Sequence, residues 1–202
     1  MTSQLVYSSS LNGAAFLLFE LRQVLTLKEK GFTNKEIREK VVEENLFQYL
    51  NPGRINRALP SVMRRADVFD ESLCELFIHS TIEESKAMNL YAIMKTDLLF
   101  YEFMNEVIRI KIQDNNLLLE KKDLNGFFTD KAEQSDRVAG WSDINTEKLK
   151  RAYMQVIFES GLLRTRRGQE LMPLFIEEEF KQHLISIGDR KYLLAMGDYG
   201  DL

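Results

Sequence analysis

The chain has 202 residues, of which 45% are hydrophobic, 29% are charged and only three are prolines. This composition suits one compact globular domain, or two small ones that share a core, with long helices, and it excludes an extensively disordered chain. The net charge of −4 excludes binding to nucleic acid through the average field of the protein, so any such binding must come from local basic patches.

The single cysteine and the N-terminal sequence indicate the cellular compartment of the protein. Cys74 cannot form an intrachain disulfide, and we expect it to be a small buried residue of a protein in a reducing cytoplasm. The N-terminus has neither the basic region nor the cleavage site of a signal peptide. Its apolar run "AAFLLF" is broken by Glu20 and Arg22, far short of the roughly 18–20 residues that cross a bilayer. We therefore expect a cytoplasmic protein with no membrane partner.

Two helices are predicted at the start of the chain. Apolar residues recur at helical spacing from Asn12 to Lys30, and Gly31 follows as a stop. In the next stretch, "TNKEIREKVVEENLF", we expect Thr33 or Asn34 as the N-cap, and Glu36 lies three positions after Thr33, which is a capping-box pattern. A second, amphipathic helix is therefore expected after Thr33.

A third helix is predicted in "NPGRINRALPSVMRRADVF". Asn51 and Pro52 suit its N-cap and first position. Proline in a helix interior removes a hydrogen bond and clashes with the preceding turn. We therefore expect Pro60 to open a second short helix, which carries Arg64 and Arg65.

The rest of the chain is also patterned as helices. A helical, aromatic-rich region runs from Asp70 to Gln113, and its part "LLFYEFMNEVIRI" is expected to be central and buried. A shorter amphipathic helix follows, then a helix from Thr146 to Ser160, another near Glu177 to Ile187, and a last short helix. Strands are expected only in a short hairpin near 163–175.

This pattern predicts an all-α fold, a compact bundle of eight or nine helices with helix-turn-helix-like units. We expect one globular unit over 1–202, with a helix-turn-helix-like part at 1–69, a helical core at 70–135 and a winged helix-turn-helix-like part at 136–202.

Catalytic motifs are missing from the sequence. His79 and His183 are isolated from other metal ligands, and no phosphate-binding glycine loop or nucleophile elbow occurs. The carboxylates of Glu177, Glu178 and Glu179 fan outward in a solvated first turn, where the helix dipole stabilises them. We expect no enzyme, no metal and no cofactor.

The first candidate site is the helix-turn-helix-like segment 33–69. Arg54, Asn56 and Arg57 lie in the first turns of its second helix, where such a helix meets base edges or phosphates. Arg64 and Arg65 would follow near the DNA backbone. The alternative is a pair of packed helices with solvated arginines.

The second candidate site is the basic stretch after the helix Thr146–Ser160. Lys148 and Arg151 share its polar face, and Gly161 ends it. "RTRRG" then projects three arginines into a turn, as the wing of a winged helix-turn-helix does when it touches phosphates. These arginines are Arg164, Arg166 and Arg167. The alternative is an ordinary solvated helix end, since positive charge there suits the dipole.

Four stretches together resemble the BrxA family of BREX phage-defence systems. They are "YSSSLNGAAFLLFELRQV", "GFTNKEIREKVVEENLFQ", "PGRINRALPSVMRR" and "GWSDINTEKLKRAYMQVIFESGLL". The resemblance runs from Tyr7 to about Gly197, in the same order and at similar spacing. It implies an all-α protein likened to the antitermination factor NusB, with helix-turn-helix units and basic surfaces. Pro60 departs from the family pattern, and this puts the outward direction of Arg64 and Arg65 in doubt.

The resemblance also implies a cytoplasmic accessory role beside a methyltransferase, a large ATPase and a phosphatase-like protein. It supplies no catalytic residues, and the family's label as an inner membrane protein finds no support in this sequence. The favoured hypothesis is a monomer that binds double-stranded DNA, with RNA as the less favoured ligand. The alternative is an adapter that docks another BREX component without touching DNA. Basic residues on one continuous face would favour the DNA-binding hypothesis over the adapter hypothesis.

Overall fold

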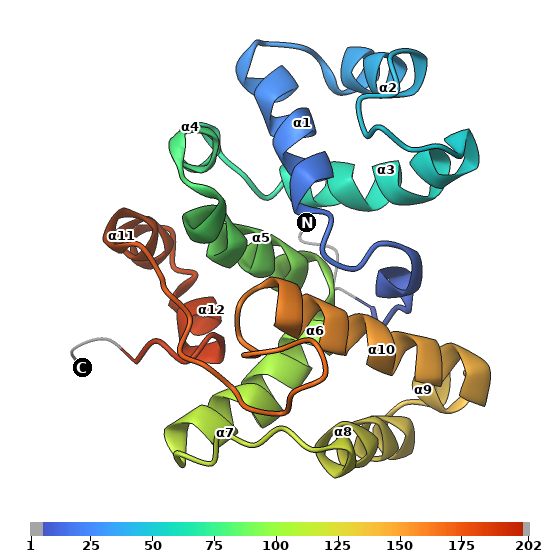
Figure 1. The fold of residues 1–202 in the computed structure, drawn as a ribbon, viewed down its shortest axis with the longest axis vertical. Coiled ribbons are helices and arrows are strands. Elements are labelled where there is room, and N and C mark those ends of the chain that lie inside the picture. Colours follow the sequence, from blue (N-terminus) through green and yellow to red (C-terminus); the bar gives the residue numbers. More distant parts are fainter. Residues whose placement is uncertain (1–5, 200–202) are drawn as a thin grey trace.

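The computed structural model describes residues 6–199, and that part of the chain is helical with no strand (Figure 1). The ends of the predicted 1–202 unit, residues 1–5 and 200–202, lie outside the described residues. In chain order the elements are η1 (Ser10–Gly13), α1 (Leu18–Glu29), α2 (Asn34–Glu43), α3 (Pro52–Ala66), α4 (Glu71–His79), α5 (Ile82–Thr96), α6 (Leu98–Phe103), the π-helical turn η2 (Met104–Ile108), α7 (Arg109–Gln113), α8 (Lys121–Gln134), α9 (Asp136–Ala139), α10 (Asp143–Glu159), α11 (Glu178–Ser186) and α12 (Arg190–Ala195).

The all-α prediction is confirmed. If α6, η2 and α7 are counted as one continuous helix, nine helices in the described residues are seven residues or longer. Two local predictions also hold. Thr33 and Glu36 form the capping box of α2, and the Asn51 side chain accepts from the Gly53 amide at the start of α3.

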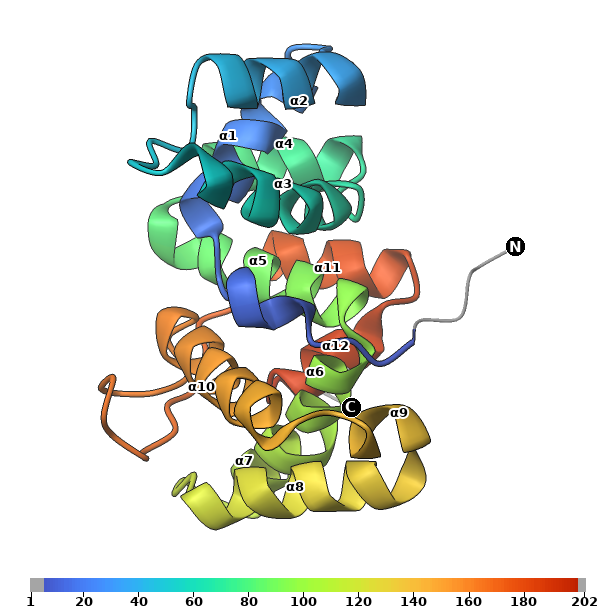
Figure 2. The same ribbon diagram turned by 90° about the vertical axis from the view of Figure 1, so that its right-hand side faces the viewer.

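The helices form an elongated stack around α5 (Figures 1 and 2). α1, α2 and α3 lie at one end, α8 and α9 at the other, and α10 crosses between them. Every residue of α5 from 87 to 94 is buried. The predicted burial of "LLFYEFMNEVIRI" holds on one side only, because Phe100 and Phe103 are fully buried whereas Ile110 is 40% exposed. Cys74 is buried, as predicted.

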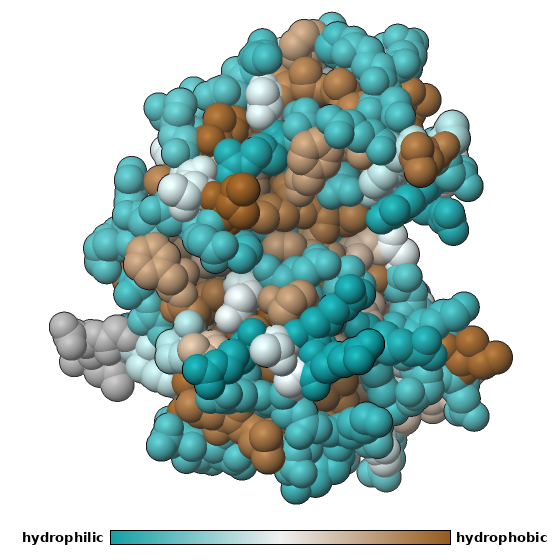
Figure 3. Space-filling view, viewed as in Figure 1, coloured by the Kyte–Doolittle hydropathy of each residue, from teal (hydrophilic) through white to brown (hydrophobic). Residues whose placement is uncertain are grey.

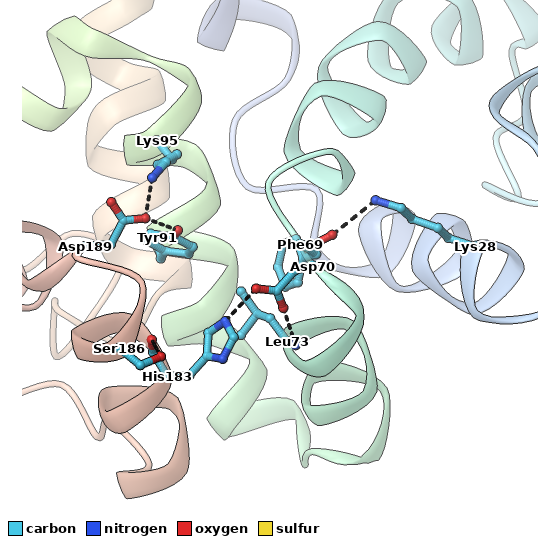
Figure 4. A network of polar contacts seen from close by, with 9 residues as sticks. All are labelled: Lys28, Phe69, Asp70, Leu73, Tyr91, Lys95, His183, Ser186 and Asp189. Carbon is cyan, nitrogen blue, oxygen red and sulfur yellow. Dashed lines mark hydrogen bonds and ion pairs between the residues drawn. The ribbon is translucent and has the colours of Figure 1, made fainter. Parts of the chain in front are cut away.

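The C-terminal helices are tied to this centre by polar contacts (Figure 4). Asp70 caps α4 by accepting from the Leu73 amide, and its second oxygen lies 2.9 Å from His183 Nε2 of α11. Tyr91 Oη of α5 donates to Asp189 Oδ2 over 2.6 Å, and Lys95 pairs with the same carboxylate. These contacts fix α11 and α12 against α4 and α5.

The prediction of one helix from Asn12 to Lys30 is wrong at its start. The chain forms the short η1, runs non-helically through 14–17, and begins α1 only at Leu18. Leu17 adopts a left-handed conformation with φ of 50°. The cause is a set of long-range donors that take the backbone carbonyls of this segment, so the carbonyls are not available to a helix. Arg65 Nη1 donates to the Phe16 carbonyl over 2.7 Å, and Asn89 Nδ2 donates to the same oxygen over 2.7 Å.

The predicted break at Pro60 is also wrong, because α3 runs unbroken from Pro52 to Ala66 with Pro60 inside it. A proline in a helix leaves the carbonyl four residues earlier without its usual donor. Here that residue is Asn56, and both Asn56 and Pro60 are exposed, so water can solvate the carbonyl. The helix therefore tolerates the proline on its solvent side.

Candidate nucleic-acid interface

Nine of the ten residues predicted to touch nucleic acid are exposed. They are Arg54, Asn56, Arg57, Arg64, Lys148, Arg151, Arg164, Arg166 and Arg167. The exception is Arg65, which is 2% exposed, and its prediction as a contact residue is wrong.

Arg65 is a structural residue. Its guanidinium donates to the carbonyls of Phe16, Ala15 and Ala14, with the Ala15 contact at 2.9 Å. Burial lowers the pKa of Arg65 to about 9, so the group still carries its charge at neutral pH. A charged group this buried is satisfied by the three carbonyl dipoles and has no surface left for a ligand.

A groove of about 610 Å³ lies between the start of α3 and the outer face of α10, and residues 11–20 form its floor. Arg54 lines it from α3, whereas Lys148 and Arg151 line it from α10. Figure 3 shows the surface notched between these two parts of the molecule, with hydrophilic residues on both sides. The structure therefore brings Arg54 together with two predicted contact residues, Lys148 and Arg151, that lie about a hundred positions later in the sequence. We call this the basic groove.

The apolar pattern of α10 places the two basic side chains. Leu149, Tyr153 and Val156 are fully buried, and their spacing turns Lys148 and Arg151 to the opposite, exposed side. The N-terminal part of α10 is also joined to the groove floor, because Asn12 Nδ2 donates to Asn145 Oδ1 over 2.6 Å.

Arg54 is held from beneath by an aromatic ring. Its guanidinium carbon lies 4.3 Å from the centroid of the Tyr49 ring, in cation–π geometry. Tyr49 Oη in turn donates to the buried carboxylate of Glu20. Burial and this hydrogen bond raise the pKa of Tyr49 well above its usual range, so the phenol stays protonated. The stack restricts Arg54 to the rim of the basic groove.

The floor of the basic groove contributes backbone donors. Among the described residues, the amide groups of residues 15–20 have no hydrogen-bond acceptor, and they include the first turn of α1. The positive end of the α1 dipole therefore faces the same region as the three basic side chains. Glu20 and Glu159 also line the groove, so its formal charge is +3 − 2 = +1, against −4 for the whole chain.

The arginine turn after α10 is anchored at its base. Leu163 and Leu171 form an isolated antiparallel bridge, so the predicted hairpin is reduced to a single pair. Arg164 Nη1 lies 2.9 Å from Glu170 Oε2 across the turn. Arg166 and Arg167 are exposed and form no ion pair with any residue in the range 6–199. Figure 2 shows this turn and the segment leading into α3 projecting to the same side of the molecule.

A second pocket, of about 690 Å³, joins the basic groove to this turn. It is lined by Arg164 and Lys86 among mostly apolar side chains, and it shares Phe16, Leu18 and Glu159 with the basic groove. Asn56, Arg57 and Arg64 line neither. The contributions of Lys86 and Glu159 could not be predicted from the sequence, because no motif marks them.

The α2–α3 unit departs from a compact helix-turn-helix. The connection between these helices spans residues 44–51, which is longer than the three- or four-residue turn of that motif. The helix-turn-helix assignment therefore stays a prediction. Within residues 6–199, no helix combines the length and apolarity that a membrane crossing requires. No group of three or more potential metal ligands occurs in the same part of the chain.

Comparison with known proteins gives three findings. A family model described as BrxA matches residues 6–188. The "BREX protein BrxA" of Bacillus cereus (strain H3081.97) is 37% identical over 194 residues, covering 96% of this chain and 97% of the relative. The crystal structure of an uncharacterized protein from Magnetospirillum magneticum superposes with a TM-score of 0.82 at 18% identity, covering 94% of this chain and 97% of that one. This last likeness shows the fold alone.

Proposed function

The chain belongs to the BrxA family of BREX proteins, and from that premise we propose that it is a non-enzymatic accessory protein that binds double-stranded DNA through the basic groove. The observation that carries the proposal is the convergence of Arg54, Lys148 and Arg151 on one groove. Their exposed heads carry no ion pair with any other described residue.

The binding mode follows from the chemistry of the groove. Exposed arginine and lysine side chains and free backbone amides suit phosphate oxygens, which carry no sequence information. The groove has few neutral polar side chains that could read base edges. We therefore expect weak sequence preference. Arg166 and Arg167 would add phosphate contacts beyond the groove, because the turn that carries them projects to the same side of the molecule as the segment leading into α3 (Figure 2).

The test is a matched pair of triple variants. The groove variant is Arg54→Ala/Lys148→Ala/Arg151→Ala. The control is Arg137→Ala/Lys121→Ala/Arg190→Ala, which removes the same residue types from exposed positions on α8, α9 and α12. Both lower the net charge equally, so the long-range field changes equally. Fluorescence anisotropy with a labelled DNA duplex should show weakened binding for the groove variant and near-parental binding for the control.

Two outcomes would contradict the proposal. Parental affinity in the groove variant would remove the groove from the binding site. An equal loss of affinity in both variants would mean that binding depends only on the net charge of the protein and not on the groove. A duplex RNA of the same sequence, used as competitor, distinguishes DNA from RNA as the ligand. If RNA displaces the labelled DNA better than unlabelled DNA does, the groove is an RNA-binding site.

An adapter role is the second candidate, and exposed apolar side chains favour it. Leu50 is fully exposed before α3, and Ile144 is 70% exposed in the first turn of α10. Such residues can anchor a protein partner. The replacement Leu50→Ser/Ile144→Ser should leave DNA affinity unchanged under the DNA proposal. It should abolish co-purification with BREX components under the adapter proposal. Likeness to NusB remains a prediction.

A further inference from the structure

The pocket beside the basic groove differs from it in chemistry. Phe158, Leu163 and Met172 line it together with the shared residues Phe16 and Leu18, so most of its wall is apolar. Its volume of about 690 Å³ falls within the roughly 300–1,000 Å³ of small-ligand sites. We call it the apolar pocket.

The cations at the edge of the apolar pocket are already neutralised. Arg164 pairs with Glu170 at 2.9 Å, and Lys86 Nζ lies 2.7 Å from Glu83 Oε1. Glu159 adds a carboxylate on the shared wall. A phosphate is therefore not favoured in this pocket, whereas an uncharged apolar group is favoured.

The two neighbouring sites match the phosphate and the base of a nucleotide. The basic groove suits a phosphate, and the adjoining apolar pocket suits a flat, uncharged ring system. Because the sites share Phe16, Leu18 and Glu159, one strand can reach both. We propose that the apolar pocket receives one unpaired nucleobase of a DNA strand whose phosphates lie in the basic groove.

Stacking and hydrogen bonding would both hold the base. The half-buried ring of Phe158 offers an aromatic surface, and stacking on such a ring is tolerant of sequence. Glu159 can only accept hydrogen bonds when ionised, and it favours a base that presents an exocyclic amino group, as cytosine does. Gln155 Nε2 donates to Glu159 Oε1 over 2.8 Å and so orients the carboxylate. The site thus selects unpaired cytosine over unpaired thymine.

This inference rests on the proposed DNA binding, and the experiment separates the two. Three labelled duplexes are compared: a perfect duplex, one with a single bulged cytidine, and one with a bulged abasic nucleotide. The last two carry equal numbers of phosphates, so they differ only in the base. The parent protein should bind the bulged cytidine about fivefold to a hundredfold more tightly than the abasic bulge, as expected for one stacked base.

Variants assign the preference to the pocket. Phe158→Leu should remove most of the preference for the base, whereas Phe158→Tyr, which keeps the ring, should retain it. A fourth duplex with a single bulged thymidine tests the carboxylate: Glu159→Gln should reduce the preference for cytidine over thymidine and keep the preference for a base over the abasic site. The groove variant should weaken all three duplexes by similar factors. Replacing the bulged base by 2-aminopurine gives a second readout, because the fluorescence of this base changes when it leaves the stack of the duplex for the pocket.

Equal affinity for the base-bearing and abasic bulges, with salt-dependent binding intact, would overturn the pocket proposal and leave the groove in place. Absence of binding to all three duplexes would overturn both. Unchanged base preference in Phe158→Leu, with the thermal midpoint preserved, would also overturn the assignment of the base to this pocket.

Discussion

Replacing Arg65 by alanine should unfold the groove floor and destabilise the whole protein. The Arg65 side chain is 2% exposed and donates to three backbone carbonyls, at 2.7 and 2.9 Å for Phe16 and Ala15. In the variant Phe16 keeps the Asn89 amide as a donor, but Ala14 and Ala15 lose the donor that Arg65 provides.

The magnitude follows from those unpaired groups. Each buried acceptor left without a donor costs about 1–3 kcal/mol, so the buried Ala14 carbonyl and the half-buried Ala15 carbonyl together cost at most about 6 kcal/mol. Removing the buried charge offsets part of this cost, whereas the cavity left by the side chain adds to it. We expect a net loss of about 3–5 kcal/mol in the free energy of unfolding. At about 2–4 °C per kcal/mol for a chain of this size, the thermal midpoint falls by about 6–20 °C.

The neighbouring arginine is the control. Arg64 is exposed and its one side-chain hydrogen bond is to Ser61 Oγ at 3.0 Å. Arg64→Ala should therefore change stability by no more than about 0.5 kcal/mol. Chemical denaturation followed by circular dichroism measures the unfolding free energy of both variants. If Arg65→Ala unfolds at the same denaturant concentration as Arg64→Ala, the role of Arg65 as the support of the groove floor is refuted.

Three further outcomes are expected. The double variant Arg166→Ala/Arg167→Ala should weaken DNA binding for all sequences alike and leave the stability within about 0.5 kcal/mol of the parent, which anisotropy and melting together check. Burial raises the pKa of Asp97, so its proton stabilises the fold at low pH and that contribution is lost as pH rises through the raised value. Asp97→Asn lacks this contribution, and in denaturation series its stability relative to the parent should increase as pH rises; a constant difference would contradict this. Gly161 has φ of 93°, so Gly161→Ala should lower the unfolding free energy by about 1–2 kcal/mol, and an unchanged melting curve would count against strain there.

Local features of the fold were predictable because their causes lie within a few residues. The capping box of Thr33 and Glu36 uses two side chains one helical turn apart. The outward direction of Lys148 and Arg151 follows from the buried positions Leu149, Tyr153 and Val156 on the other side of α10. The arginine turn was placed correctly because Gly161 ends that helix at a positive φ.

Features with distant causes were not predictable from the same patterns. The break before α1 depends on Arg65, whose partners lie 49–51 positions away in the chain. Arg64 and Arg65 are adjacent in the sequence, yet one is exposed and the other buried, because only Arg65 meets the carbonyls of residues 14–16. The basic groove needs α3 and α10 on either side of residues 11–20, and no periodicity within either helix encodes that arrangement.

The salt dependence of duplex binding tests the central proposal most directly. If three or four phosphates are neutralised, the logarithm of the binding constant should fall against the logarithm of salt concentration with a slope of about −3 to −4. The variant Arg54→Ala/Lys148→Ala/Arg151→Ala should reduce the magnitude of that slope by about 2–3, since each phosphate that is no longer neutralised removes about one unit or slightly less. The control triple should keep the parental slope. A parental affinity that is the same at low and high salt, or a slope unchanged in the groove variant, would contradict DNA binding through this groove.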